Sequence, residues 1–186
     1  MRVISGKFKG RKIVSSKDKL TRPLKDLTKE SIFNIINHTN KFSIKLQNSE
    51  VLDLFSGTGS FGIECLSRGV KFVTFVENYN GVLPILKDNL NNLNLKNQYK
   101  IIEKNIFKDL NFKIFKKKFN IIFLDPPYKE KDLNKLINLI IKEKLLASNG
   151  IIIIHRHKKQ NDIYPDKFEI LDQKKYGISK IIFGNY

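Results

Sequence analysis

The chain has 186 residues and a formal charge of +17, which suits a polyanionic partner such as nucleic acid, although many lysines can also form a solvated surface. Cys65 is the only cysteine, which excludes an intramolecular disulfide, and the three scattered histidines lack zinc-type spacing, so we expect no metal. The N-terminus lacks an apolar signal core and the longest purely apolar run, Ile151 to Ile154, is too short for a bilayer, so we expect a soluble cytoplasmic monomer of one domain, residues 1–186.

Residues 1–25 are predicted to form a basic arm. The segments RVISG and GRKIV flank Lys7-Phe8-Lys9 in the manner of a small β-hairpin. Residues 1–30 carry ten Lys or Arg and three Asp or Glu, a net charge of +7. We therefore expect the arm to contact phosphates.

A helix is predicted after the arm. Asp26 or Thr28 can cap its N-terminus, and Glu30 lies in its first turn. Three apolar residues share one face at helical spacing: Ile32, Phe33 and Ile36.

Residues 51–186 read as a Rossmann-like α/β core. Short apolar β-branched runs alternate with helical patterns in the order VLDLF, FGIECLSR, KFVTFVE, VLPILKDNLNNL, YKIIE, FNIIFLD, DLNKLINLIIKEKLL and IIIIH. Continuous apolar runs indicate parallel strands buried on both faces, with helices on both sides of the sheet. The tail FEILDQKKYGISKIIFG reads as two strands around Tyr176-Gly177, which adds an antiparallel edge.

The glycine-rich segment DLFSGTGSFG follows the first of these strands. Gly57, Gly59 and Gly62 match G-x-G-x-x-G, and Glu77 ends the next strand 20 residues beyond Gly57. A nicotinamide cofactor and S-adenosylmethionine both fit such a loop. The Asp53 carboxylate would repel a pyrophosphate and attract a sulfonium and an ammonium, so it favours S-adenosylmethionine as the methyl donor.

Further cofactor-binding residues are predicted around the loop. Ser56 lies in the turn itself, and Glu77 can accept hydrogen bonds from both ribose hydroxyls. Asn105 follows YKIIEK and either contacts the adenine edge, with Ile106 packing on the ring, or simply forms a turn.

The tetrapeptide Asp125-Pro126-Pro127-Tyr128 follows the apolar strand FNIIFL. An amino group on a nucleobase is a poor nucleophile because its lone pair is delocalised, so its methylation depends on geometry. The Asp125 carboxylate and the Pro126 carbonyl can each accept an N–H bond and orient the amine. The prolines stiffen the turn, and Tyr128 can stack on a base that has left its own stack.

With these motifs, the chain resembles class I S-adenosylmethionine-dependent methyltransferases and, within them, the bacterial 16S rRNA (guanine-N2)-methyltransferases of the RsmD type. The likeness covers nearly the whole length and rests on RVISGKFKGRKI, TRPLKD…KESIFNII, DLFSGTGSFGIECLSRG, FVE and FLDPPY. It implies a seven-stranded Rossmann-like sheet and transfer of one methyl group to the 2-amino group of a guanine in 16S rRNA of the small ribosomal subunit or its assembly intermediate.

The resemblance also implies roles for single residues. Asp53, Gly57 and Gly59 correspond to the cofactor loop, Glu77 to the ribose ligand, Asn105 to the adenine contact, and Asp125 to Tyr128 to the amine-positioning turn. Arg11 and Arg22 match basic positions of the family's N-terminal arm. The chain departs from the family pattern where Leu27 and Lys29 replace arginines and where His155-Arg156-His157 ends the fifth core strand.

Other readings stay open at this point. The turn serves any planar amine, so the substrate could be adenine in DNA or RNA, or a protein amide, and the basic arm favours nucleic acid. A non-catalytic rRNA-binding assembly factor would share the fold. Neither the modified nucleotide nor the choice between naked RNA and an assembled subunit follows from the residues.

Overall fold

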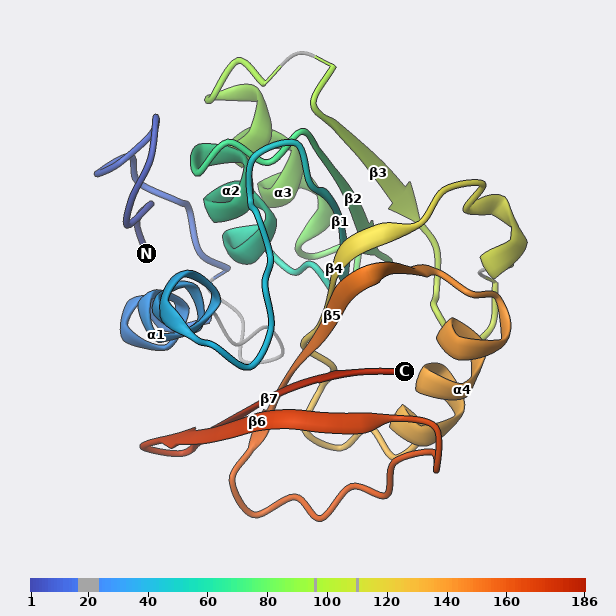
Figure 1. The fold of residues 1–186 in the computed structure, drawn as a ribbon. Coiled ribbons are helices and arrows are strands. Elements are labelled where there is room, and N and C mark those ends of the chain that lie inside the picture. The colour runs from blue at the N-terminus through green and yellow to red at the C-terminus, as the bar shows by residue number, and fades with distance from the viewer. Residues whose placement is uncertain (17–23, 96, 110) are drawn as a thin grey trace.

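The computed structural model describes residues 1–16, 24–95, 97–109 and 111–186. A seven-stranded sheet with the order β3-β2-β1-β4-β5-β7-β6 runs through the molecule (Figure 1). Helices cover both faces of this sheet: α1, α2 and α3 lie on one side and α4 lies on the other. The predicted Rossmann-like fold, mostly parallel with an antiparallel edge, is confirmed.

Five parallel strands form most of the sheet, and the helices connect them. In chain order the elements are α1 (Asp26–His38), β1 (Glu50–Leu54), α2 (Ser60–Ser67), β2 (Phe72–Glu77), α3 (Leu83–Asn91), β3 (Tyr99–Glu103), the short 3₁₀ helix η1 (Phe112–Ile114), β4 (Phe119–Leu124), α4 (Leu133–Lys142), β5 (Leu146–His157), β6 (Glu169–Tyr176) and β7 (Ser179–Asn185). The last two strands pair antiparallel, and β7 also pairs antiparallel with β5, as the tail pattern predicts.

Two apolar layers hold the helices on the sheet. Successive strand residues point to opposite faces, so Ile121 and Phe123 of β4 join the layer under α1, α2 and α3, while Ile122 and Leu124 join the layer under α4. Cys65 of α2 is fully buried in the first layer, as expected of a small core residue, and burial raises the pKa of its thiol. Among the described residues, no helix is long and apolar enough to cross a membrane.

The N-terminal arm is less regular than the predicted hairpin. Its strands pair through one antiparallel bridge, Arg2 with Lys12, supported by backbone bonds such as Val3 N–H to the Arg11 carbonyl at 2.9 Å. Gly6 and Gly10, both with positive φ, lie in the turns that connect the two paired segments. The arm is therefore a short, turn-rich hairpin that also packs on the core through hydrogen bonds to Glu64 and Ser67 of α2.

The start of α1 also differs from the prediction. Lys25 occupies the N-cap position with no side-chain cap bond, and Asp26 lies in the first turn, so neither Asp26 nor Thr28 is the cap. The Asp26 carboxylate is instead 3.9 Å from the ammonium of Lys29 and 3.9 Å from Nε of Arg2. The predicted apolar face is confirmed, because Ile32, Phe33 and Ile36 are buried.

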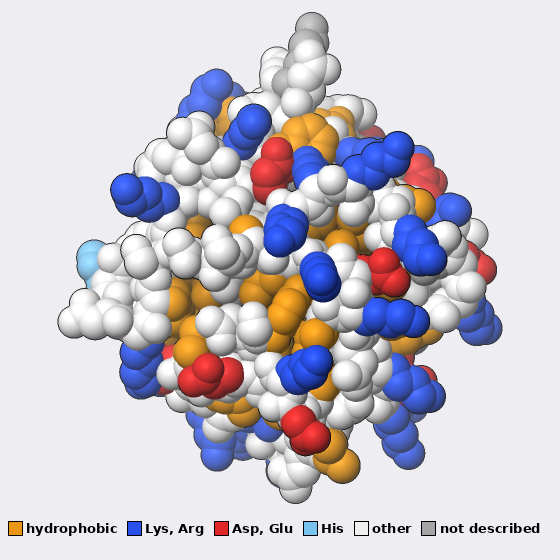
Figure 2. All heavy atoms as spheres, turned by 45° about the vertical axis from the view of Figure 1, so that its right-hand side comes forward, with side chains coloured by type: hydrophobic (Ala, Val, Ile, Leu, Met, Phe, Trp, Pro, Cys, Tyr) orange, Lys and Arg blue, Asp and Glu red, His pale blue; other side chains and the backbone are white. Residues whose placement is uncertain are grey.

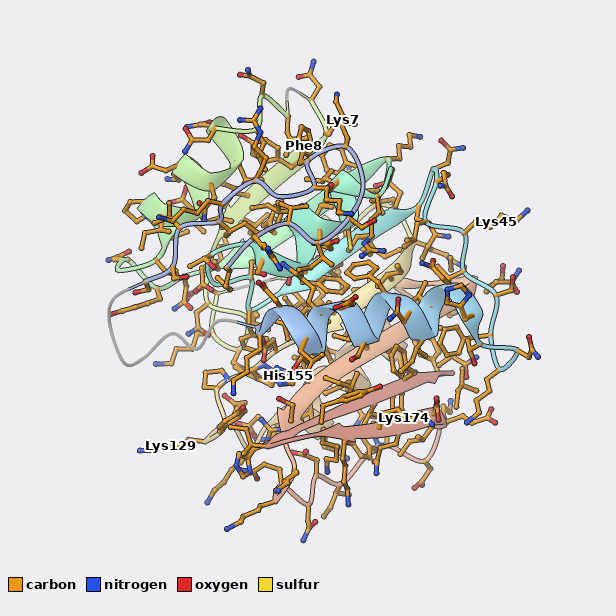
Figure 3. All side chains as sticks on the ribbon, turned by 90° about the vertical axis from the view of Figure 1, so that its left-hand side faces the viewer. Lys7, Phe8, Lys45, Lys129, His155 and Lys174 are labelled. Atoms are coloured by element: carbon orange, nitrogen blue, oxygen red, sulfur yellow. The ribbon has the colours of Figure 1, made fainter. Side chains whose placement is uncertain are left out.

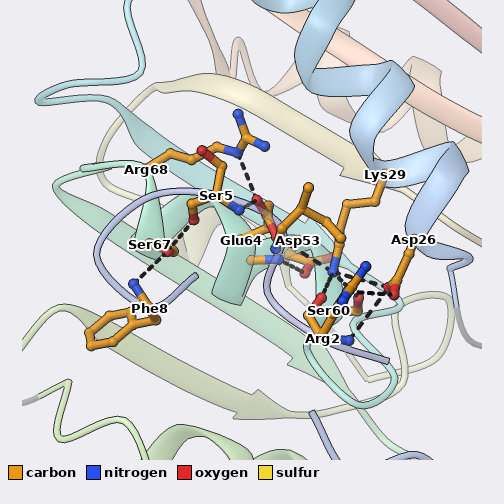
Figure 4. A network of polar contacts seen from close by, with 12 residues as sticks. Arg2, Ser5, Phe8, Asp26, Lys29, Asp53, Ser60, Glu64, Ser67 and Arg68 are labelled. Carbon is orange, nitrogen blue, oxygen red and sulfur yellow. Dashed lines mark hydrogen bonds and ion pairs between the residues drawn. The ribbon is translucent and has the colours of Figure 1, made fainter. Parts of the chain in front are cut away.

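A buried polar network fastens α1 and the arm to α2 (Figure 4). The Lys29 ammonium lies 3.5 Å from the Glu64 carboxylate and donates to the Arg2 carbonyl at 2.8 Å. Glu64 also accepts the backbone N–H groups of Ile4 and Ser5, at 2.8 and 3.0 Å. Lys29 is therefore a buried structural residue, which removes it from the candidate RNA contacts, whereas the neighbouring Leu27 is exposed.

Candidate active site

A cavity of about 500 Å³ opens at the carboxyl ends of β1, β2 and β4. This is the point where the strand order reverses between β1 and β4, the usual ligand position in open α/β sheets. Most of the predicted site residues line it. They are Asp53, Ser56, Gly57, Glu77, Asp125, Pro126, Pro127 and Tyr128. Residues that were not predicted also line the cavity, among them Leu24, Phe55, Tyr79, Lys129 and His155.

Asp53 is the most unusual charged group in the cavity. Its side chain is buried, with Oδ2 accepting the Gly62 N–H at 3.0 Å, and Oδ1 has no hydrogen-bond partner among the described residues. Burial raises the pKa of Asp53 well above its ordinary value; the Gly62 bond lowers it in part, and the nearby Asp125 and Glu77 charges raise it further. A buried carboxylate oxygen without a donor fits a cationic ligand.

Glu77 holds the glycine-rich loop in place. Its Oε2 accepts the Gly57 N–H at 2.7 Å, and its Oε1 accepts the N–H groups of Asn78 and Tyr79 at 2.8 and 2.9 Å. Ser56 links β1 to β2 by donating to the Asp53 carbonyl at 2.6 Å and accepting the Val76 N–H at 3.0 Å. The carboxylate that ends β2 is therefore fixed beside the loop.

Two glycines of the motif serve the turn and the packing. Gly59 is the N-cap of α2 with φ +84°, which a residue with a Cβ adopts only with strain. A Cβ on Gly62 would lie 2.3 Å from Cε1 of Phe75, so this glycine allows α2 to approach β2 closely. Gly59 and Gly62 do not line the cavity. The Gly62 N–H does donate a hydrogen bond to Asp53, which lines it.

The Asp125–Tyr128 turn is braced by a buried arginine that the motif does not include. Arg156 of β5 donates from Nη1 to the Pro127 carbonyl at 3.1 Å and from Nη2 to the Glu130 carbonyl at 2.9 Å. Its charge is balanced by Asp162, whose carboxylate lies 2.7 Å from Nη2. The turn is thus held by the end of the next strand as well as by its own prolines.

His155 is a second residue that the motifs miss. Its Nδ1 lies 2.8 Å from Oδ1 of Asp125, and its Nε2 lies 2.9 Å from Oγ of Ser179. The sequence interpretation gave no part to the histidines and left this departure from the family pattern without an account. The signal that could have found it is register, because β4 and β5 are neighbouring parallel strands in which Leu124 pairs with Ile154.

Besides Gly59, three predicted residues lie away from the cavity, and one more is not described. Oδ1 of Asn105 accepts the N–H groups of Phe107 and Lys108, at 2.9 and 3.0 Å, and Ile106 is buried in the apolar layer under α4. Arg11 is exposed on the N-terminal arm. Arg22 lies outside the described residues.

Positive side chains are spread over the surface. Figure 2 shows Lys and Arg side chains distributed across one face with Asp and Glu between them. Close to the cavity, Lys129 points outward beside the turn, on the same side of the molecule as His155 (Figure 3). No cluster of metal-ligating side chains occurs in the part of the chain that the structure describes.

The strand order, the loop after β1, the acidic end of β2 and the turn after β4 together define a Rossmann-like methyltransferase of class I. The chain belongs to the family described as Conserved hypothetical protein 95, whose model matches residues 1–185.

Its relatives include enzymes named Ribosomal RNA small subunit methyltransferase D. The protein of that name from Buchnera aphidicola subsp. Acyrthosiphon pisum is 36% identical over 172 residues, 92% of this chain and 86% of the relative. The one from Haemophilus influenzae is 32% identical, covering 96% of this chain and 90% of the relative. The one from Escherichia coli K12 is 30% identical, covering 83% and 73%.

Solved structures share the fold. The Haemophilus influenzae protein HI0767 superposes with a TM-score of 0.74 at 29% identity, covering 99% of this chain and 97% of that one. The protein SMU.776, solved in complex with SAH, is 19% identical and superposes with a TM-score of 0.63, covering 84% of this chain and 49% of that one. The chain is therefore a methyltransferase of the RsmD family.

Proposed function

We propose that the chain transfers a methyl group from S-adenosylmethionine to the exocyclic 2-amino group of a guanine in 16S rRNA. One observation carries the proposal: the amine-positioning turn Asp125–Tyr128 and the buried carboxylate of Asp53 line the same cavity. The first can hold a planar amine and the second can hold a cationic donor. The names of the relatives support small-subunit rRNA as the substrate.

The cavity fits S-adenosylmethionine by charge. Asp53 offers the sulfonium and ammonium groups an oxygen that lacks a donor in the described structure, and Glu77 ends the neighbouring strand where a ribose would lie. SMU.776, which shares the fold, was solved in complex with SAH, and this supports a cofactor of the same class. Asn105 and Ile106, in the loop after β3, remain the proposed adenine contacts.

The bound donor supplies a methyl group on a positively charged sulfur. The nitrogen lone pair forms the new N–C bond, the C–S bond breaks with its electron pair remaining on sulfur, and the nitrogen loses one proton to solvent. The rate depends on how well the amine is aimed, because an amine conjugated with the ring must rehybridise as it attacks.

The turn supplies that aim. The Asp125 carboxylate and the Pro126 carbonyl accept the two amine N–H bonds and stabilise the charge that develops on nitrogen. Arg156 keeps the backbone of the turn fixed through the Pro127 and Glu130 carbonyls. Tyr128 lines the cavity, where its ring can stack on a base that has swung out of the RNA.

The positive charge of the chain supports an RNA substrate. We assign Arg11, Arg22 and the exposed Lys129 to contacts with the RNA phosphates, in keeping with the net charge of +17. Binding of 16S rRNA should weaken steeply as salt rises, since phosphate contacts release counterions. Equal affinity at low and high salt would contradict this assignment.

The test is a transfer assay with tritiated S-adenosylmethionine and four acceptors: small subunits, large subunits, naked 16S rRNA and DNA. The nucleic acids come from cells that lack the enzyme, so that the target is unmodified. We expect label in the small subunit or its rRNA, and none with Asp125→Ala. Label in DNA or in large subunits alone would overturn the proposal.

A further inference from the structure

The imidazole of His155 connects β5 with the Asp125–Tyr128 turn and with β7. Both of its ring nitrogens are engaged, Nδ1 by Asp125 at 2.8 Å and Nε2 by Ser179 at 2.9 Å. The residue is 7% exposed, so the ring is held in one orientation by packing as well as by hydrogen bonds. Figure 3 places it below the first turn of α1.

Sheet register explains why these side chains meet. Leu124 of β4 pairs with Ile154 of β5, and the next residue along each strand is Asp125 and His155, respectively. Neighbouring strands are about 4.8 Å apart, which brings the two side chains together where β4 ends. Ser179 begins β7, which pairs antiparallel with the same segment of β5.

The direction of each hydrogen bond follows from the groups involved. A carboxylate only accepts, so Nδ1 of His155 donates to Oδ1 of Asp125. The Ser179 hydroxyl can either donate or accept, so it serves Nε2 in both the neutral and the protonated ring. The ring can therefore change its charge without losing either contact.

We propose that His155 is a positioning residue for methyl transfer: its Nδ1–H occupies Oδ1 of Asp125 and leaves Oδ2 to accept the N–H of the substrate amine. This inference rests on the proposed function. A terminal carboxylate rotates over a broad torsional well, so an unsupported Asp125 would sample orientations in which neither oxygen faces the amine. Fixing one oxygen removes that freedom before the substrate binds.

The charge of His155 gives the positioning a pH dependence. Burial alone lowers the pKa of His155, but the charge and hydrogen bond of Asp125 outweigh burial and the opposing Arg156 charge, so the pKa is raised. A protonated His155 partly neutralises the charge of the Asp125 carboxylate, and this weakens the electrostatic stabilisation of the positive charge that develops on the substrate nitrogen. Activity should therefore rise with pH as the ring loses its second proton. The other charged side chains that line the cavity are Asp53 of β1, Glu77 of β2 and Lys129 of the β4–α4 loop.

The experiment compares His155→Leu, His155→Asn and the surface control His38→Asn in steady-state methylation of small subunits between pH 5.5 and 9. Leucine removes the donor, whereas the asparagine amide reaches as far as Nδ1 and keeps an N–H without a titrating ring. His38, exposed at the end of α1, tests the loss of a histidine elsewhere. Urea unfolding of each variant checks the fold, and His155→Leu is also made in the Asp125→Asn background.

We expect His155→Leu to lower kcat roughly 10- to 100-fold with little change in KM for S-adenosylmethionine. His155→Asn should keep most of kcat and lose the acid limb of the wild-type profile, and His38→Asn should keep both. In the Asp125→Asn background, His155→Leu should have no further effect, because it acts through that carboxylate.

If the wild-type enzyme is active and His155→Leu has the same kcat and pH profile, the inference is overturned while the proposed function stands. It would also be overturned if the leucine effect were equally large in the Asp125→Asn background, since His155 would then act on the fold. A wild-type protein that binds S-adenosylmethionine and methylates none of the four acceptors would overturn the proposed function, and this inference with it.

Discussion

The Lys29 ammonium and the Glu64 carboxylate are 3.5 Å apart, and both side chains are fully buried. Charges are rarely buried without strong compensation, and here each side chain is also hydrogen-bonded to the backbone of the N-terminal arm. The pair therefore fixes three segments at once: the arm, α1 and α2.

The first prediction concerns this pair. Lys29→Met should lower the free energy of unfolding by about 3 kcal/mol, because among the described residues it leaves the buried Glu64 carboxylate with Arg68, at 2.8 Å, as its one cationic partner. Urea unfolding followed by circular dichroism measures the change. Lys135→Met is the control, since Lys135 pairs with Asp132 on the surface, and its unfolding curve should match wild type. Equal midpoints for both variants would contradict the structural importance of the buried pair.

The second prediction links S-adenosylmethionine binding to pH. Because burial raises the pKa of Asp53, a cationic ligand has to displace a proton from this carboxyl group when the pH is near or below that pKa. Affinity should therefore fall as the pH falls, with proton release on binding. Calorimetry in buffers of different ionisation enthalpy measures the released proton, and Asp53→Asn should bind more weakly without the pH dependence. A dissociation constant independent of pH in the wild type would count against the assignment of Asp53.

Asp53→Asn should weaken cofactor binding but stabilise the ligand-free fold at neutral pH. A carboxyl group with a raised pKa in the folded state contributes stability below its unfolded pKa, and this contribution is lost as pH rises through the folded pKa. Without ligand, Asp53→Asn should therefore unfold at higher urea than wild type at neutral pH, and the difference should shrink toward acid pH. A variant less stable than wild type at every pH would contradict the cost of the buried charge.

The third prediction concerns Arg156. Arg156→Lys keeps a positive charge near Asp162 but cannot reach the Pro127 and Glu130 carbonyls together, because the fork of the guanidinium is lost. Hydrogen exchange should quicken in residues 126–132, and kcat should fall by roughly 10-fold or more as the turn loosens. Unchanged exchange together with unchanged kcat would show that the prolines alone hold the turn.

The fourth prediction separates two kinds of glycine. Gly62→Ala should lower the free energy of unfolding by about 2–3 kcal/mol, since the new Cβ lies 2.3 Å from the ring of Phe75. Gly10→Ala meets no atom within 4 Å and should cost only about 1 kcal/mol, from its positive φ. Thermal or urea unfolding of the two variants checks the order, and the reverse order would contradict the close packing of α2 on β2.

Most of the fold could be predicted from the sequence because each buried parallel strand is a continuous apolar run, and the runs have turn or helix signals between them. The antiparallel pairing within the N-terminal arm was predicted as well, whereas its hydrogen bonds to α2, far along the chain, could not be. The cap of α1 was predicted wrongly for a similar reason: the Asp26 carboxylate, which suits a cap by type, pairs instead with Lys29 and Arg2.

The site shows the same division. That Asp53, Glu77 and Asp125 lie around one cavity could be predicted, because each lies at or next to the end of a strand and parallel strands bring such residues to one edge. His155 and Arg156 were not, because their partners depend on the pairing of β4 with β5, which no local pattern specifies. The turn-forming bonds of Asn105 likewise depend on the loop that follows β3.

The most direct test of the account is the identity of the modified nucleoside. Small subunits from cells lacking the enzyme are incubated with S-adenosylmethionine and either wild-type protein or Asp125→Ala, and the rRNA is digested to nucleosides for mass spectrometry. The account predicts one new 2-methylguanosine per subunit with the wild type and none with the variant. A methylated adenosine, or 2-methylguanosine formed equally by Asp125→Ala, would contradict it.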